Sequence, residues 1–386
     1  KEGFPAAFWV CACTEIFERL AYYLGRSLIL IFVTASVATG GLGLSDTVAA
    51  NMQSNLTAFS YLLPLFGAVI VDKYIGARYT TPVGMFIAAA GYFTGGIAKS
   101  SAGVYAMIFL VSLGLALFKN GAIIGRVITD KSQMDPAFSM RYTLVNVGAF
   151  IGTFLVGILY KDVFAKDGVL GFAPCFKMAA LMMVLGGLWY IFVCWRFLGD
   201  LGKLPFKKTL TEEEKAAEAK KKEETGTKQP LTTIEKKRIG AIFVASLFSI
   251  VFWIFWYLGY MPVYFYWAEN MDWVVAGYQV PSTWFDAANS LFCVILGPVT
   301  AALWKKLAAR PQGDMSLFRK TGLGIAIIGV GYLFYAAIDI MRGGEKASVL
   351  WLIVFAFLLT MGEMFFSPLG HSFISKYSPS RYLAVM

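Results

Sequence analysis

Most of the chain consists of apolar runs that are long enough to cross a membrane. A helix needs about 20 predominantly apolar residues to span the hydrocarbon core of a bilayer. Windows of that length give candidate spans at residues 8–35, 48–72, 79–98, 103–127, 140–160, 173–197, 240–266, 284–304, 320–341 and 349–374. The chain is 58% hydrophobic and 15% charged, whereas soluble domains average about 45–50% and about 25%. We therefore predict an all-α, multi-pass membrane protein with ten helices in this chain.

Basic residues lie in alternate gaps between these spans. Residues 36–47 hold no Lys or Arg, the next gap holds Lys73 and Arg78, and residues 305–320 hold five basic side chains. The positive-inside rule then predicts a cytoplasmic N-terminus in a plasma (inner) membrane. Lys161 and Lys166 depart from the rule, because their gap would lie outside. This distribution accounts for the net charge of +10 without a nucleic-acid partner.

A polar, lysine-rich segment divides the spans into two groups. Residues 199–238 are predicted to form a cytoplasmic linker, and Thr209–Glu212 has the pattern of a helix capping box. We favour a solvated spacer over a helix that lies on anionic headgroups. The linker separates an N-terminal six-helix bundle at residues 1–198 from a C-terminal bundle at 239–386, in which four spans are visible.

Cysteine and histidine usage argues against several kinds of chemistry. There is one histidine, His371, which we interpret as a gate or packing residue, and no two cysteines form a CxxC pair. Neither a disulfide framework, a zinc site nor a catalytic triad is indicated. We expect no enzymatic activity, no metal and no cofactor.

The first span carries a polar stripe inside an otherwise apolar run. Residues three or four apart share a face of a helix, so these side chains line up over about three turns. The stripe comprises Glu15, Glu18, Arg19, Tyr22, Tyr23 and Arg26. Charged groups are costly in lipid, so this face is expected to line a polar cavity.

A lysine inside the fourth span is the next unusual charge. We favour a buried Lys119 paired with Glu15 or Glu18 over a lysine that snorkels to the interface. Asn146, at the start of the fifth span, suits an interhelical hydrogen bond or a substrate contact equally well. Tyr61 in the second span is interpreted as a packing residue on physical grounds alone.

The second half contributes further polar groups. Asp286 and Asn289 open the eighth span, and Glu363 lies within the tenth with no basic residue one or two turns away. An intramembrane carboxylate of this kind indicates a proton site or an amine-binding site. Pro368 and Gly370 are predicted to break the helix beside it.

Motifs in five regions recur in the order typical of one family. Residues 67–78 match GxxxxDxxxGxR, with Asp72 and Arg78, which resembles the signature loop of the major facilitator superfamily. The others are ExxER (Glu15, Glu18, Arg19) with Tyr22, Tyr23 and Arg26 following, Lys119, Asn146-x-Gly148-Ala-Phe, and Gly362-Glu363-x-x-x-Ser367-Pro368-x-Gly370. Tyr61 also precedes Asp72 by eleven residues, as in the family pattern. Together they resemble the proton-coupled oligopeptide transporters, the POT or PTR family.

This resemblance implies the major facilitator fold of two six-helix bundles and symport of di- and tripeptides with protons by alternating access. Arg26 and Lys119 would hold the peptide carboxylate, and Glu363 its amino terminus. Backbone contacts would come from Tyr22, Tyr23, Tyr61, Asn146 and Asn289. Proton coupling would use Glu15, Glu18, Arg19 and Lys119, and Asp72, Arg78, Pro368 and Gly370 would be gate or structural residues. Another small substrate (an amino acid, nitrate or a peptidomimetic drug) and a non-transporting peptide receptor remain alternatives, and the oligomeric state is unspecified.

The sequence departs from the family pattern in two places. The seventh span holds aromatic residues over 252–260, where the family commonly carries a Glu. We therefore expect proton coupling to depend more on the first span or on another carboxylate. The fold also needs twelve spans, and residues 378–386 resemble the start of an eleventh helix, so two further helices are expected beyond Met386.

Overall fold

A computed structural model describes residues 3–129, 134–205, 216, 233–260, 262–313 and 315–377. The side chains of residues 134–136, 138, 139, 235, 262, 301, 305, 308, 317 and 366–377 are not described. The predicted capping box at Thr209–Glu212 and the segment 378–386 lie outside the described residues. Contacts group the chain into two units, Lys1–Thr209 with Gln279–Leu291, and Leu210–Tyr278 with Phe292–Met386.

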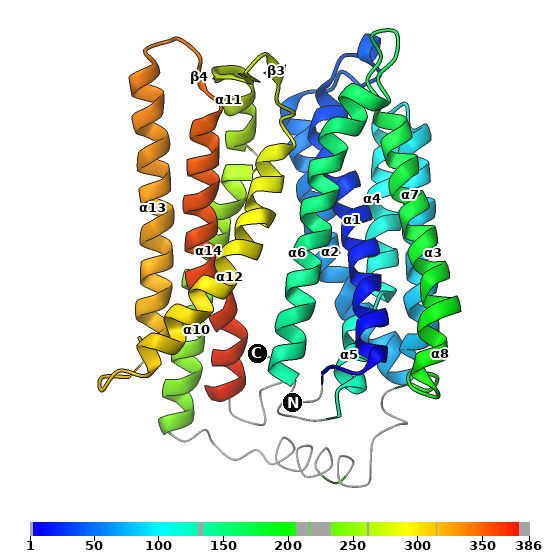
Figure 1. Ribbon diagram of the computed structural model, residues 1–386, viewed down its shortest axis with the longest axis vertical. Helices are drawn as coiled ribbons and strands as arrows, with labels where there is room; N and C mark the ends of the chain where they lie inside the picture. The colour runs from blue at the N-terminus through cyan, green and yellow to red at the C-terminus, as the bar shows by residue number, and fades with distance from the viewer. Residues whose placement is uncertain are drawn as a thin grey trace. The chain divides into compact units, whose positions relative to one another are not determined.

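The first unit is a bundle of long helices (Figure 1). Its elements are α1 (Ala6–Thr34), η1 (Val37–Thr39), α2 (Asp46–Lys73), α3 (Ala77–Ile97), α4 (Ser101–Leu117), α5 (Asn120–Val127), α6 (Met134–Ile158), η3 (Leu159–Val163), α7 (Phe172–Trp189), η4 (Tyr190–Cys194) and α8 (Trp195–Leu198). Helix α1 packs against α6 and α7, while α3 packs against α4 and α7. The polar stripe of the first span is therefore enclosed by other helices.

Two glycines bring α6 into close contact with the polar stripe. A Cβ atom on Gly152 would lie 2.5 Å from the backbone oxygen of Leu20, and one on Gly148 would lie 3.0 Å from that of Ile16. Only a residue without a side chain permits such an approach of two helix backbones. The Asn146-x-Gly148 motif thus places α6 directly beside α1.

The fourth predicted span is interrupted in the middle. Helix α4 ends at Leu117 and α5 begins at Asn120, with Phe118 and Lys119 outside both helices. The Lys119 backbone N–H donates to Thr81 Oγ1 on α3 at 3.3 Å, so an orphan amide at the break is satisfied by a side chain. The break was not predicted, because the apolar run 103–127 was read as one continuous span, although Asn120-Gly121 directly after the break is a common turn dipeptide.

The second unit contains α10 (Thr233–Tyr260), α11 (Pro262–Asn270), most of α12 (Trp284–Ala308), α13 (Leu317–Arg342) and α14 (Leu350–Tyr377). Helices α13 and α14 pack together and both contact α10. Strands β1 (Met271–Asp272) and β4 (Ala347–Ser348) pair in parallel. Strand β2 (Val274–Val275) pairs with β3 (Tyr278–Gln279). The boundary between the two units falls within β3, after Tyr278. An aromatic core forms around Phe355, with Trp267 and Tyr335 in ring contact with it.

The predicted helix break at Pro368 and Gly370 is wrong. Helix α14 continues through both positions to Tyr377. A proline removes one backbone N–H from the ladder, and membrane helices tolerate such a loss when neighbouring groups satisfy the freed carbonyl. The side chains at 368 and 370 lie outside the described residues, so their gate or structural role stays a prediction.

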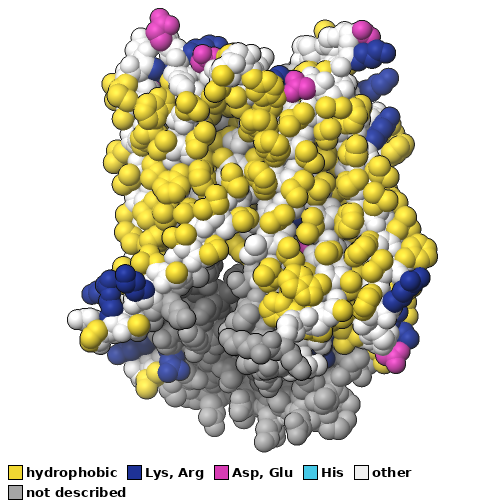
Figure 2. All heavy atoms as spheres, viewed as in Figure 1, with side chains coloured by type: hydrophobic (Ala, Val, Ile, Leu, Met, Phe, Trp, Pro, Cys, Tyr) yellow, Lys and Arg dark blue, Asp and Glu magenta, His cyan; other side chains and the backbone are white. Residues whose placement is uncertain are grey.

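The surface is apolar where helices meet the surroundings. Figure 2 shows hydrophobic side chains over most of the visible face, with Lys, Arg, Asp and Glu gathered towards its upper and lower ends. Leu333 and Ile340 are 73% and 79% exposed. Seven of the described helical segments are long and apolar enough to cross a membrane. Such a surface is stable in lipid and costly in water, which confirms the multi-pass membrane architecture.

Candidate functional site

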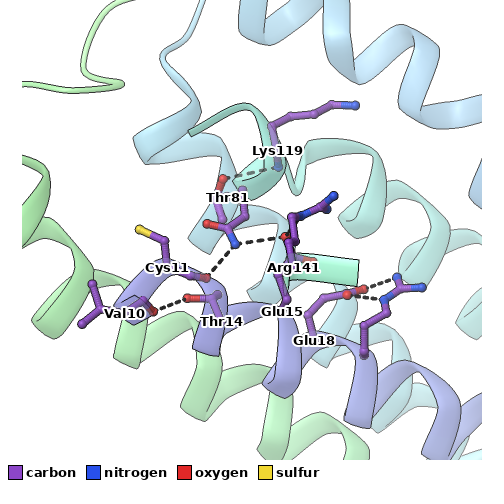
Figure 3. Close-up of polar contacts among 10 residues, drawn as sticks. Val10, Cys11, Thr14, Glu15, Glu18, Thr81, Lys119 and Arg141 are labelled. Carbon is purple, nitrogen blue, oxygen red and sulfur yellow. Dashed lines mark hydrogen bonds and ion pairs between the residues drawn. The ribbon is translucent and has the colours of Figure 1, made fainter. Parts of the chain in front are cut away.

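Glu15 is the centre of a buried polar cluster (Figure 3). Its Oε1 accepts hydrogen bonds from Arg141 Nε on α6 at 2.9 Å and from Asn120 Nδ2 on α5 at 3.1 Å. Asn120 Nδ2 also donates to the Cys11 backbone oxygen at 2.8 Å. Because Glu15 is only 2% exposed, its charge needs these partners. One α1 carboxylate thereby connects three helices.

Glu18 pairs with its own sequence neighbour. Arg19 Nε and Nη2 donate to the two Glu18 carboxylate oxygens, each at 2.5 Å. The Arg19 guanidinium also lies 4.6 Å from the centre of the Tyr22 ring, a cation–π distance. Glu18 is 1% exposed, so this forked pair neutralises a carboxylate that is withdrawn from solvent.

Lys119 does not pair with either glutamate, and that prediction is wrong for this conformation. Its Nζ donates to the Pro64 backbone oxygen on α2 at 2.9 Å. Figure 3 shows the ammonium group pointing away from Glu15 and Glu18. The physical reason is the break between α4 and α5, which places Lys119 outside the helix and turns its side chain towards α2. Its role in coupling stays a proposal.

The partners that Glu15 does have were missed from the sequence. Neither Arg141 nor Asn120 was among the candidate residues predicted from the sequence. Two features of the sequence point to these partners. Arg141 lies five residues before Asn146, and Asn120 is a polar residue within an apolar run. Neither feature identifies Glu15 as the partner, because the pairs are 126 and 105 residues apart in the chain.

Arg26 faces a carboxylate at the start of α12, within the first unit. Arg26 Nη1 lies 3.8 Å from Asp286 Oδ2, and the two side chains are 8% and 20% exposed. The guanidinium also lies 5.7 Å from the Tyr23 ring centre. The sequence marked Asp286 only as an opening residue of the eighth span. The structure adds it to the polar groups that contact the stripe.

The other predicted substrate residues of the first unit differ in exposure, from the buried Tyr22 to the exposed Tyr61. Tyr22 and Tyr23 meet edge to face at 5.3 Å, and Asn289 is half-buried. Asn146 Nδ2 donates to the Tyr142 oxygen of its own helix at 3.0 Å, and that bond is not interhelical. Tyr61 is 70% exposed, and both its packing role and its substrate contact stay predictions.

Glu363 lies in the second unit among apolar side chains. It is 8% exposed, and Cys293 Sγ lies 3.9 Å from its Oε2. Cys293 and the neighbouring Met364 belong to one buried cluster. The carboxylate is therefore enclosed by apolar side chains and a thiol of α12.

Arg78 binds backbone carbonyls at the end of α8. Its Nη1 donates to the Gly199 oxygen, and its Nη2 donates to the Trp195 oxygen at 3.1 Å. The Trp195 indole returns a bond to the Arg78 oxygen at 3.2 Å. A guanidinium at a helix C-terminus is favoured by the helix dipole. Arg78 thus joins the first turn of α3 to α8. Asp72, six residues earlier on α2, is half-buried.

No metal site is found within the described ranges, where no three His, Cys, Asp or Glu side chains come together to hold an ion. The polar groups instead form ion pairs and hydrogen bonds on helices that cross a membrane. Such an arrangement can bind small charged molecules and can exchange protons or ion-pair partners.

The sequence is similar to that of known membrane transporters. Residues 198–386 match the family model described as the POT family. The "Di-/tripeptide transporter" of Lactococcus lactis subsp. cremoris is 24% identical over 100% of this chain and 86% of that protein, and the "Uncharacterized transporter YclF" of Bacillus subtilis (strain 168) is 24% identical over 99% and 84%. These relatives are transporters rather than enzymes.

Solved structures match the fold over the same range. The crystal structure of "peptide transporter POT in complex with sulfate" superposes with a TM-score of 0.86 at 24% identity, covering 99% of this chain and 85% of that one. A "POT family transporter in complex with 5-aminolevulinic acid" superposes with a TM-score of 0.85 at 23% identity, covering 98% and 86%. These matches confirm the major facilitator architecture predicted from the sequence. The family model over residues 198–386, the relatives at 24% identity and the shared fold make this chain similar to the transporters of the POT family.

Proposed function

We propose that this protein is a proton-coupled symporter that imports di- and tripeptides by alternating access. The observation that carries the proposal is a set of buried cations and carboxylates on membrane helices, of which Glu15, Glu18 and Arg26 lie on one helix. The di-/tripeptide transporter of Lactococcus supports the substrate class. A zwitterionic peptide needs a cation for its carboxylate and an anion for its amino group.

Arg26 and Lys119 are the proposed ligands of the peptide carboxylate. Lys119 donates to the neutral carbonyl of Pro64, and a substrate carboxylate would be a stronger acceptor for the same ammonium group. Arg26 Nη1 lies 3.8 Å from Asp286 Oδ2. A substrate carboxylate could approach the guanidinium more closely and form two hydrogen bonds with it. Tyr22, Tyr23, Tyr61, Asn146 and Asn289 would contact the rest of the peptide.

Glu363 is the proposed ligand of the peptide amino group. A carboxylate that is 8% exposed among apolar neighbours gains more from an ammonium partner than one in water does. An amine-terminated substrate would therefore bind here in preference to a blocked one.

Proton coupling is assigned to the α1 carboxylates. Glu15 is bound to Arg141 and Asn120, and Glu18 to Arg19. Protonation of either carboxylate removes the charge that holds its arginine, so an added proton changes which ion pairs exist. Lys119 would enter this network only after a rearrangement that turns its side chain from Pro64.

The sidedness and domain organisation remain part of the proposal. We infer a cytoplasmic N-terminus and a cytoplasmic linker at 199–238 between the bundles 1–198 and 239–386, in a plasma (inner) membrane. The alternation of basic loops supports this orientation. A cysteine-accessibility assay on the linker in intact cells tests it.

The decisive experiment is uptake of a labelled dipeptide into liposomes that contain the purified protein. An inwardly directed proton gradient should drive accumulation, and a proton ionophore should abolish it. Uptake of a labelled amino acid or of nitrate but not dipeptide would favour another substrate of the same fold. Peptide binding without uptake would instead indicate a receptor.

A further inference from the structure

The first turn of α12 brings an aspartate to the substrate-side end of the polar stripe. Asp286 Oδ2 lies 3.8 Å from Arg26 Nη1, and the side chains are 20% and 8% exposed. Asp286 belongs to the same compact unit as α1. An ion pair that is this withdrawn from solvent is sensitive to the loss of either charge.

Contacts with α6 and η3 hold this turn in place. The Trp284 ring stacks on Phe154 with 4.6 Å between ring centres, and its Nε1 donates to the Phe154 oxygen at 3.0 Å. A Cβ on Gly157 would lie 2.6 Å from Thr283 Oγ1, so the chain before α12 packs tightly on α6. Lys161 Nζ on η3 donates to the Gln279 oxygen. The position of Asp286 opposite Arg26 is therefore fixed by packing on the aromatic and glycine positions of α6.

The surrounding groups identify Arg26 as the cation that faces Asp286. On α1, Tyr23 lies next to the Arg26 guanidinium. On α6, the residues in contact with this turn are Phe154 and Gly157, which carry no charge. On η3, Lys161 bonds Gln279 and lies 3.8 Å from the Asp162 carboxylate. The 3.8 Å ion pair therefore joins a charge on α1 to a charge on α12.

Protonation of Asp286 would leave Arg26 as a buried cation. A buried charge that loses its partner is strongly destabilised, and it gains correspondingly from another anion. A carboxylate that reached Arg26 would displace Asp286, and displaced Asp286 would in turn bind a proton more readily. Linkage of this kind is reciprocal: the anion promotes protonation and the proton promotes anion binding.

We propose that Asp286 is a proton-coupling residue, which exchanges Arg26 for a proton when the substrate carboxylate binds Arg26. The proton comes from water on the outer side, binds a carboxylate oxygen of Asp286, and leaves to the cytoplasm when Arg26 returns to Asp286. This inference rests on the proposed function. The seventh span offers no acid within 252–260, so the aspartate of the eighth span supplies a carboxylate to Arg26 in this chain.

The test compares D286N, D286E and the control E269Q in liposomes. Glu269 is an exposed acid of α11, and its neutralisation should change nothing. Counterflow measures exchange of labelled for unlabelled dipeptide and needs no net proton movement, whereas accumulation needs coupling. A gradient of one pH unit sustains a concentration ratio of up to about tenfold per coupled proton.

We expect D286N to keep counterflow and to lose accumulation, so that its inside-to-outside ratio falls to one, while D286E and E269Q accumulate peptide. Accumulation by D286N equal to that of the wild type would overturn the inference. Absence of dipeptide counterflow in the wild type would contradict the proposed function instead.

A second measurement tests whether Asp286 binds a proton, and it does not depend on transport activity. Infrared difference spectra between acidic and neutral pH record carboxyl groups as they gain protons. The wild-type spectrum should contain a protonated-carboxyl component that D286N lacks and that D286E shifts. Identical carboxyl bands in the wild type and D286N would overturn the inference, whatever the substrate.

Discussion

Glu15 Oε1 and Arg141 Nε lie 2.9 Å apart, although the residues are 126 positions apart in the chain. The carboxylate is 2% exposed and the guanidinium is 30% exposed. The pair joins α1 to α6 at the level where Gly148 allows their backbones to approach. It gives Glu15 a basic partner other than the lysine that the sequence suggested.

Removal of Arg141 should destabilise the protein, because Glu15 would keep its buried charge with Asn120 as its remaining bonded side chain. We expect Arg141→Gln to cost on the order of 3 kcal/mol, measured as a lower Tm of the detergent-solubilised protein. The double variant Glu15→Gln/Arg141→Gln should recover much of this loss, since no buried charge is left. Equal Tm values for the wild type and Arg141→Gln would contradict the pairing.

Loss of Lys119 should weaken binding of the peptide carboxylate. A hydrogen bond to a charged group contributes about 1.5–3 kcal/mol, so Lys119→Ala should raise the KM for a free dipeptide by roughly tenfold or more. Affinity for a C-terminally amidated dipeptide should change little. Lys73→Ala, an exposed lysine on α2, is the control, and a parallel loss for both peptides would exclude the carboxylate role.

Glu363→Gln should affect the other end of the substrate. Transport of peptides with a free amino terminus should fall, because an amide cannot offer the negative charge that an ammonium group needs in a site of low polarity. N-acetylated peptides, which compete weakly with the wild type, should compete equally with both proteins. Competition assays against a labelled dipeptide measure this difference, and similar losses for both classes would refute the amine role.

The Arg78 guanidinium should be essential for stability at the end of α8. Arg78→Lys keeps the charge but cannot bind the Gly199 and Trp195 carbonyls with one planar group. We expect a loss of about 2–3 kcal/mol in the free energy of unfolding, seen as a lower Tm. Arg196→Ala, which removes an exposed arginine of α8, should leave the Tm unchanged.

The membrane architecture could be predicted because it depends on properties local to the chain. Runs of apolar residues have to be about as long as the bilayer is thick, and each of the ten predicted spans coincides with one helix or with two or three consecutive helical segments. The polar stripe on α1 also follows from helical spacing alone. Its burial follows from the cost of charge in lipid.

The partners within the site could not be predicted in this way. Lys119 turns to Pro64 because the helix breaks at residue 118, and the local sequence does not specify which way the side chain turns. Asp286 meets Arg26 because Trp284 stacks on Phe154, a contact between residues 130 positions apart. Such pairings depend on how each helix is rotated and on which glycines allow two helices to touch.

The amino-acid sequence by itself therefore determined the membrane class, the spans, the family resemblance and the helix face that carries the charges. The tertiary structure decided which opposite charges meet: Glu15 with Arg141 rather than Lys119, and Arg26 with Asp286. The reason is physical. Hydropathy and helical periodicity are summed over neighbouring residues, whereas a buried ion pair forms only where packing brings two distant side chains within hydrogen-bonding or ion-pairing distance.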